Sequence, residues 1–325
     1  MLTDFDIVES TSAICEHNSG SMTVQNFDID GLINRFLEFA DVSAQSEKTY
    51  RRGLKAFFEY WESQARPVLT REFVISYRDF LESEGRKATT IHTYLAPVRI
   101  FATWAHAEGL IAVDIASRVK APKITRAHKK DALTSNQLST VLKNIDRTTV
   151  KGRRDYAMVL LCGVCGLRTV EVMRANVSDM RSLGDRTVLY VQGKGRTEKA
   201  EFVRLPEAVE NAIRLTFKDR TDTNDQAAPL FVSTSHNNQG KRMTTRAISA
   251  ICKESFLEVG LTSDRLTAHS LRHTAVTLAL LGGESLQTVQ AFARHAAIAT
   301  TTIYAHNLDS MKNTSENTII NSLSL

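Results

Sequence analysis

The stretch His269-Ser-Leu-Arg-His273 decides how the second half of this 325-residue chain is interpreted. On a helix, its first histidine and Arg272 lie three residues apart and share one face. Farther along the chain, Tyr304 follows His295 by nine residues. Arginine pairs with phosphate oxygens, and tyrosine becomes a nucleophile when a base accepts its proton. These residue types suit chemistry on a phosphodiester, which is anionic and resists attack by an anionic nucleophile.

Two further signals precede this stretch. Arg168 comes after Gly-Leu and is followed three residues later by Glu171. Lys194 stands between two glycines, and the β-rich segments 185–192 and 201–205 flank it. This arrangement predicts a β-hairpin with the lysine at or near its tip.

Each signal also has an ordinary structural interpretation. An arginine near a helix end is usually a surface or capping group, and a lysine between glycines usually marks only a turn. A His–Arg pair on a helix is often solvated, and a lone tyrosine in a helix usually packs. The joint occurrence of all the signals, in this order, favours a catalytic role over these alternatives.

Taken together, the motifs resemble the tyrosine recombinase family, which includes phage integrases and Xer-type resolvases. The resemblance covers roughly residues 27–306. It implies a C-shaped clamp on duplex DNA, built from an all-helical core-binding domain and a mixed α+β catalytic domain. It also implies a catalytic set: Arg168, Lys194, His269, Arg272, His295 and Tyr304.

The resemblance assigns a role to each of these groups. Arg168 and Arg272 neutralise the nonbridging oxygens of the scissile phosphate and stabilise the charge of the transition state. Tyr304 attacks phosphorus and forms a 3′-phosphotyrosine, which leaves a free 5′ hydroxyl. Because the bond energy stays in the ester, no ATP is needed. With cationic side chains in the place of a metal, we expect neither a metal ion nor another cofactor.

The remaining members handle protons and positioning. Lys194 protonates the departing 5′ oxygen, His269 is the base or proton shuttle, and His295 hydrogen-bonds the phosphate. Glu171, three residues after the first arginine of the set, is expected to orient that guanidinium. His273 is expected to cap or pack inside the domain.

The chain departs from the family pattern next to one of its histidines. Many members have Leu-Gly before the residue that corresponds to His295, whereas this chain has Ala293-Arg294. The change adds bulk and charge beside the pocket. Two interpretations stay open: an altered regulation, or a contact of the arginine with DNA.

The whole chain is predicted to be mainly α-helical with a small β-sheet. Apolar residues recur at helical spacings of three and four in four stretches between residues 32 and 105. The predicted order is a flexible lead (1–26), a helical core-binding domain (27–117), a basic linker (118–131), a catalytic domain (132–306) and a tail for protomer contacts (307–325).

Within the catalytic domain, helices and short strands are expected to alternate. A short strand is predicted at residues 230–232, in addition to the hairpin. A capping box at Thr134 predicts a helix start. Further helices are expected at about 155–165, 206–217, 244–258, 269–281, 285–293 and 299–305. Cys162 and Cys165 end an apolar helix and are expected to be reduced and buried.

Charge points to a polyanion as partner. Residues 121–325 carry 28 basic and 19 acidic side chains, and the linker has six Lys or Arg in 13 residues. The longest apolar stretch has 12 residues, too short to span a membrane, so a cytoplasmic, nucleoid-associated protein is expected. The expected DNA contacts are Lys120, Lys123, Arg126, Lys129, Lys130 and Arg196.

The sequence therefore predicts a site-specific recombinase that acts through a Holliday junction, in element integration and excision or in resolution. Its expected partners are double-stranded DNA with an inverted-repeat site and three further copies of itself, with residues 308–325 docked into a neighbouring protomer. One alternative is a type IB topoisomerase, which uses a similar set of residues. Another is a catalytically silent DNA-binding accessory protein.

Overall fold

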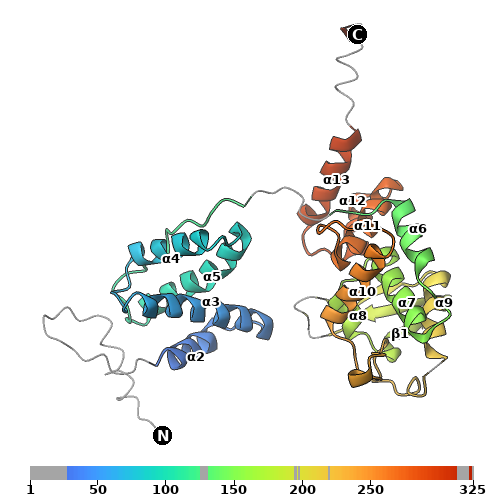
Figure 1. Cartoon of the computed structure of the whole chain (residues 1–325), viewed down its shortest axis with the longest axis horizontal. Coiled ribbons are helices and arrows are strands. Elements are labelled where there is room, and N and C mark those ends of the chain that lie inside the picture. Colours follow the sequence, from blue (N-terminus) through green and yellow to red (C-terminus); the bar gives the residue numbers. More distant parts are fainter. Residues whose placement is uncertain are drawn as a thin grey trace, which may run out of the picture. The chain divides into compact units, whose positions relative to one another are not determined.

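A computed structural model describes residues 28–124, 131–193, 196, 198–218, 220–312 and 322–323. The chain divides into two compact units, Met1–Ala127 and His128–Leu325 (Figure 1). The division falls inside the basic stretch that was expected to be a linker. Among the described residues, no helix combines the length and the apolar character needed to cross a bilayer.

The described part of the first unit is helical, as the apolar stripes predicted. Its elements are α2 (Ile29–Ala40), α3 (Ala44–Ser63), α4 (Arg71–Ser83) and α5 (Ala88–Ala107). Side-chain oxygens of Asp28, Ser43 and Thr70 accept backbone N–H bonds at the starts of the first three helices. Pro97 lies inside α5 and is buried.

Aromatic side chains fill the core of this unit. Phe57 meets Phe58, Phe73 and Tyr77 edge to face, with ring centroids 5.2 to 5.8 Å apart. Helices α3 and α5 approach closely because position 53 is glycine: a Cβ there would lie 2.6 Å from Cγ of Pro97. Tight packing therefore depends on the missing side chain.

The second unit combines helices with one small sheet. Its helices are α6 (Ser135–Asn144), α7 (Val150–Val164), α8 (Thr169–Arg174), α9 (Glu207–Phe217), α10 (Thr245–Leu257), α11 (Ala268–Leu281), α12 (Leu286–Ala293) and α13 (Ile298–Lys312), with two short 3₁₀ turns at Val177–Asp179 and His236–Asn238. The predicted capping box of Thr134 and Gln137 begins α6. Helix α13 extends beyond the helix predicted at 299–305.

Three antiparallel strands form the sheet in the order β1 (Met180–Leu183), β2 (Arg186–Val191), β3 (Glu201–Arg204). Leu189 pairs with Val203, so the predicted pairing of two strands around Lys194 is confirmed. The strand predicted at residues 230–232 is wrong, because Pro229 and Val232 make only isolated bridges. Strand β1 was not predicted, since three of its four residues are exposed and leave no alternating pattern.

Helix α7 passes through the core of the second unit and packs against α9 and α11. The thiols of Cys162 and Cys165 are free and buried, as predicted. Burial raises the pKa of Cys165 to about 12, so the thiol is protonated at neutral pH. The two cysteines therefore act as small apolar groups in the core of the second unit.

Candidate active site

The candidate active site lies where α8 and α11 begin and where α12 leads into α13. Helices α11, α12 and α13 pack against one another, and α8 follows directly on the end of α7. Gly166 allows the turn between α7 and α8 with φ of +63°, and its carbonyl accepts a hydrogen bond from Arg272 at 2.5 Å. The backbone of this turn thus helps to hold one of the predicted catalytic side chains.

Glu171 is a buried anion between two guanidinium groups. Its side chain is fully buried, and its Oε1 accepts from Nη1 of Arg168 at 2.7 Å. Its Oε2 accepts from Nη2 of Arg294 at 2.9 Å and from the backbone N–H of Arg168. Burial raises the pKa of this carboxyl, but the two arginines outweigh burial and the pKa lies below its usual range. The predicted orienting contact between Glu171 and Arg168 is confirmed.

Arg272 is the largest fully buried side chain among the described residues, with 1% exposed. It donates to the carbonyl oxygens of Gly166 and Ala293. Burial, with Arg168 and Arg294 nearby, lowers its pKa to about 9. Three guanidinium groups thus crowd around one carboxylate, and this excess positive charge favours the binding of an anion.

Arg294 occupies a position where glycine is the natural choice. It ends α12 in the left-handed region with φ of 53°, which costs a residue with a Cβ about 1–2 kcal/mol. Its side chain is 4% exposed and turns inward to Glu171 and to the carbonyl of Phe292. The extra charge that the sequence places beside the pocket therefore lies within the guanidinium cluster.

Tyr304, on α13, is 7% exposed. Burial raises its pKa to about 12, although the charges of Arg272 and Arg168 act in the opposite direction. Its hydroxyl lies within hydrogen-bonding distance of Nδ1 of His273, on α11. The phenol is therefore neutral at neutral pH and already paired with an imidazole.

His295 is a second histidine beside the tyrosine. The rings of His295 and Tyr304 are nearly parallel, at 16° and a centroid distance of 6.2 Å. Burial, with Arg272 and Arg168 nearby, lowers the pKa of His295 to about 4. Nδ1 lies 2.9 Å from Oγ1 of the buried Thr301. This histidine is thus neutral at neutral pH and fixed in orientation.

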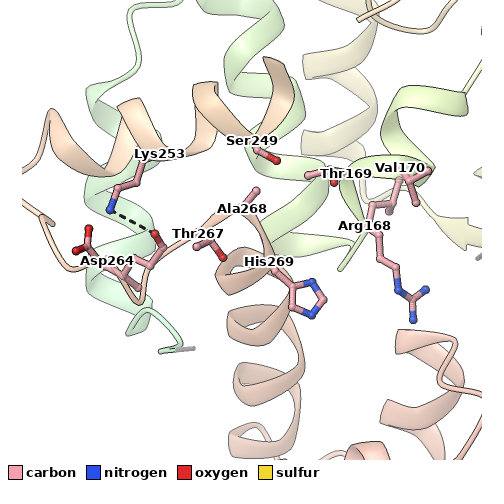
Figure 2. Close-up of a pocket in the computed structure, with 11 residues that line it drawn as sticks. Arg168, Thr169, Val170, Ser249, Lys253, Asp264, Thr267, Ala268 and His269 are labelled. Carbon is pink, nitrogen blue, oxygen red and sulfur yellow. Dashed lines mark hydrogen bonds between the residues drawn. The ribbon is translucent and has the colours of Figure 1, made fainter. Parts of the chain in front are cut away.

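His269 lies at the exposed start of α11 and lines a cavity of about 700 Å³ together with Arg168. Figure 2 shows these two side chains at one end of the cavity, with Lys253 and Asp264 at the other. The ring of His269 meets that of His273 edge to face at 4.6 Å. His269 thus lines the cavity and contacts His273, whose ring lies beside that of Tyr304.

The structure describes three of the six predicted DNA contacts. Lys120 and Lys123 are exposed in the first unit, and Arg196 lies 3.4 Å from Glu201 with 57% of its side chain exposed. The other three predicted DNA contacts, Arg126, Lys129 and Lys130, lie outside the described residues, as does the predicted catalytic Lys194. Lys199, a basic residue close to Arg196 in the sequence, pairs with the buried Asp179.

The structure thus brings together the five described members of the predicted catalytic set. It also places two residues that the sequence did not single out for the site. His273 contacts the tyrosine hydroxyl, and Thr301 holds a histidine. The spacing of four residues between His269 and His273 is a helical repeat that could have indicated the first of these.

Comparisons with known proteins agree with this geometry. Residues 131–311 match the model of the phage integrase family, and residues 33–109 match that of the phage integrase N-terminal SAM-like domain. Tyrosine recombinase XerC of Corynebacterium glutamicum is 31% identical over 85% of this chain and 87% of its own. Tyrosine recombinase XerD of Listeria innocua is 26% identical over 86% and 94%.

Solved structures share the fold. XerH recombinase bound to a palindromic difH substrate matches with a TM-score of 0.69 and 16% identity, over 95% of both chains. A lambda integrase dimer bound to a COC′ core site matches with a TM-score of 0.63 and 16% identity, over 83% of this chain and 96% of that one. The chain therefore belongs to the phage integrase family, as a tyrosine recombinase.

Proposed function

We propose that this chain is a site-specific DNA recombinase that cuts and rejoins strands through a covalent link between Tyr304 and a 3′ phosphate. One observation carries the proposal: the buried Tyr304 contacts His273 through its hydroxyl, stacks near His295, and lies in the positive field of Arg272 and Arg168. The same two cations, Arg168 and Arg272, can bind a phosphate and favour the phenolate that attacks it.

In the proposed reaction, Arg168 and Arg272 pair with the nonbridging oxygens and stabilise the five-coordinate transition state. The oxygen of Tyr304 bonds to phosphorus, and the bond from phosphorus to the 5′ oxygen breaks. Lys194 gives that oxygen its proton. The phosphotyrosine keeps the energy of the broken bond, so the 5′ hydroxyl of another strand can reverse the step.

We assign His295 to the phosphate. In this assignment Oγ1 of Thr301 donates to Nδ1 of His295, 2.9 Å away, so that the imidazole carries its proton on Nε2 and this N–H donates to a phosphate oxygen. We assign to His269, which lines the cavity, the exchange of protons with solvent. Glu171 orients Arg168 through its ion pair with the guanidinium and does not take part in the reaction.

The proposed substrate is duplex DNA with an inverted-repeat site, bound by four copies on two sites that exchange strands through a Holliday junction. The basic excess of residues 121–325 and the exposed Lys120 and Lys123 support this partner. We assign residues 308–325 to contacts between protomers, and the cellular role to integration and excision of an element or to resolution, at the nucleoid.

Capture of covalent complexes tests the proposal and locates the DNA site in the same experiment. The protein is incubated with genomic DNA of its own host, denatured, and the DNA attached to protein is sequenced. A single recurrent inverted repeat is the expected result. Random attachment would favour the topoisomerase alternative, and no attachment despite DNA binding would favour the silent accessory protein.

A second assay separates recombination from simple nicking and closing. A plasmid with two copies of the captured site should yield recombinant circles. A supercoiled plasmid that lacks the site should stay supercoiled. Relaxation of the second plasmid without recombination of the first would show topoisomerase activity instead.

A further inference from the structure

We propose that His273 is a catalytic residue that accepts the phenolic proton of Tyr304 during DNA cleavage, an inference that rests on the proposed function. From the sequence, this histidine is expected to cap or pack, and His269 is expected to be the base or proton shuttle. The geometry assigns the first proton transfer to His273, and His269 then passes the proton on to solvent.

The contact with the nucleophile is direct. Nδ1 of His273 lies within hydrogen-bonding distance of the tyrosine hydroxyl, and the two rings are 5.0 Å apart at 39°. With the ring proton on Nε2, Nδ1 has a lone pair and the phenol O–H donates to it. Because the two residues lie on α11 and α13, which pack together, the contact does not depend on a loop.

His295 is the other histidine beside Tyr304, and it is the poorer acceptor. Its Nδ1 is engaged with Thr301. Arg272 and Arg168 lie close to both the tyrosine and His295, and their positive charges oppose a further proton on that imidazole. The ring of His273, by contrast, contacts the imidazole of His269.

The proposed step balances. The O–H bond of Tyr304 breaks and its proton moves to Nδ1 of His273, which becomes an imidazolium. The phenolate oxygen bonds to phosphorus while the bond to the 5′ oxygen breaks, and that oxygen takes the proton that Lys194 donates in the proposed function. On rejoining, the tyrosine leaves as a phenolate and recovers its proton from the same imidazolium.

His269 completes a path to solvent. Its ring meets that of His273 edge to face at 4.6 Å and lines the open cavity. A proton held at His273 can therefore exchange with water through His269 while the covalent complex persists. Tyr304 thus contacts His273, which contacts His269, which lines the cavity.

The test compares two substitutions at one position. In His273→Asn, the amide occupies the place of Nδ1 and keeps a hydrogen bond to the phenol, but it does not accept a proton at neutral pH. His273→Ala removes both properties. The exposed His236→Asn, outside the site, is the matched control. The probe is a duplex with the captured site, nicked near the cleavage position to trap the adduct.

Both substitutions are expected to slow single-turnover adduct formation by about 10²–10⁴-fold at neutral pH, with unchanged DNA binding. Their rates should then rise about tenfold per pH unit above neutrality, because only the small phenolate fraction attacks. His273→Asn at the wild-type rate would overturn the proposal, since a hydrogen bond alone would then suffice. Should the alanine variant fail to fold, the asparagine variant decides alone.

A second substrate distinguishes a defect in removing the proton of Tyr304 from a defect in protonating the 5′ oxygen. A bridging sulfur in place of the 5′ oxygen leaves without needing a proton. It should restore cleavage by Lys194→Ala but not by His273→Asn. Rescue of His273→Asn would overturn the proposal by placing its defect at the leaving group. If the wild-type protein forms no adduct on any captured site, the proposed function itself fails.

Discussion

Arg294→Gly tests the buried cluster around Glu171. The substitution removes an ion pair of 2.9 Å between side chains that are 4% and 0% exposed. Removing one partner of a buried pair costs about 3–5 kcal/mol. Glycine adopts the left-handed backbone at φ of 53° without the cost of about 1–2 kcal/mol that a residue with a Cβ incurs, and this gain offsets part of the loss. The free energy of unfolding of the second unit should therefore fall by about 2 kcal/mol, since Arg168 still compensates Glu171.

Unfolding in urea, followed by far-UV circular dichroism and by tryptophan fluorescence, measures this effect. Both tryptophans, Trp61 and Trp104, lie in the first unit. The fluorescence transition therefore serves as an internal control and should not move. The loss of about 2 kcal/mol corresponds to a melting temperature lower by about 4–8 °C for a unit of this size.

A double-mutant cycle with Glu171→Gln tests whether Arg294 stabilises the second unit through Glu171. In the glutamine background, Arg294→Gly leaves no buried carboxylate without a partner and removes a buried cation that has already lost its own, so it should be nearly neutral or stabilising. An equal loss of stability in both backgrounds would show that the arginine does not act through Glu171. A stabilising effect in the wild-type background would show that backbone strain outweighs the ion pair.

Two further predictions concern packing and pH. Gly53→Ala should destabilise the first unit by about 1–3 kcal/mol, because the new Cβ would meet Cγ of Pro97 at 2.6 Å; an unchanged tryptophan transition in urea would contradict this. The pKa of His295 falls from 6.5 to about 4 on folding, so its contribution to stability is complete above 6.5 and is lost as the pH falls toward 4. His295→Asn should make unfolding less pH-dependent in that window, and equal slopes for both proteins would exclude the depressed pKa.

The sequence predicted the helices of the first unit well, because helical stripes such as Phe57 and its neighbours report directly on burial. It also predicted the residues that gather at the site, since the order of the motifs is distinctive. The strand at Met180–Leu183 escaped prediction, because its exposed side chains leave only backbone pairing to define it. The segment 230–232 has the composition of a strand but lacks a partner strand.

Side-chain contacts within the site could not be read from the sequence. The hydrogen bond between His273 and Tyr304 depends on how α11 and α13 pack, which no local pattern encodes. Likewise, the sequence shows that Arg294 adds a charge near the pocket, but only the fold shows that it turns inward to Glu171. Tertiary packing, rather than residue type, decides both contacts.

The nucleophile can be identified by mass spectrometry of the trapped adduct. Trypsin should release the peptide His295–Lys312, in which Tyr304 is the sole tyrosine. After nuclease digestion, this peptide should carry a 3′-linked nucleotide on Tyr304, and Tyr304→Phe should form no adduct. A nucleotide on another residue, or an adduct that persists in Tyr304→Phe, would contradict the proposed mechanism.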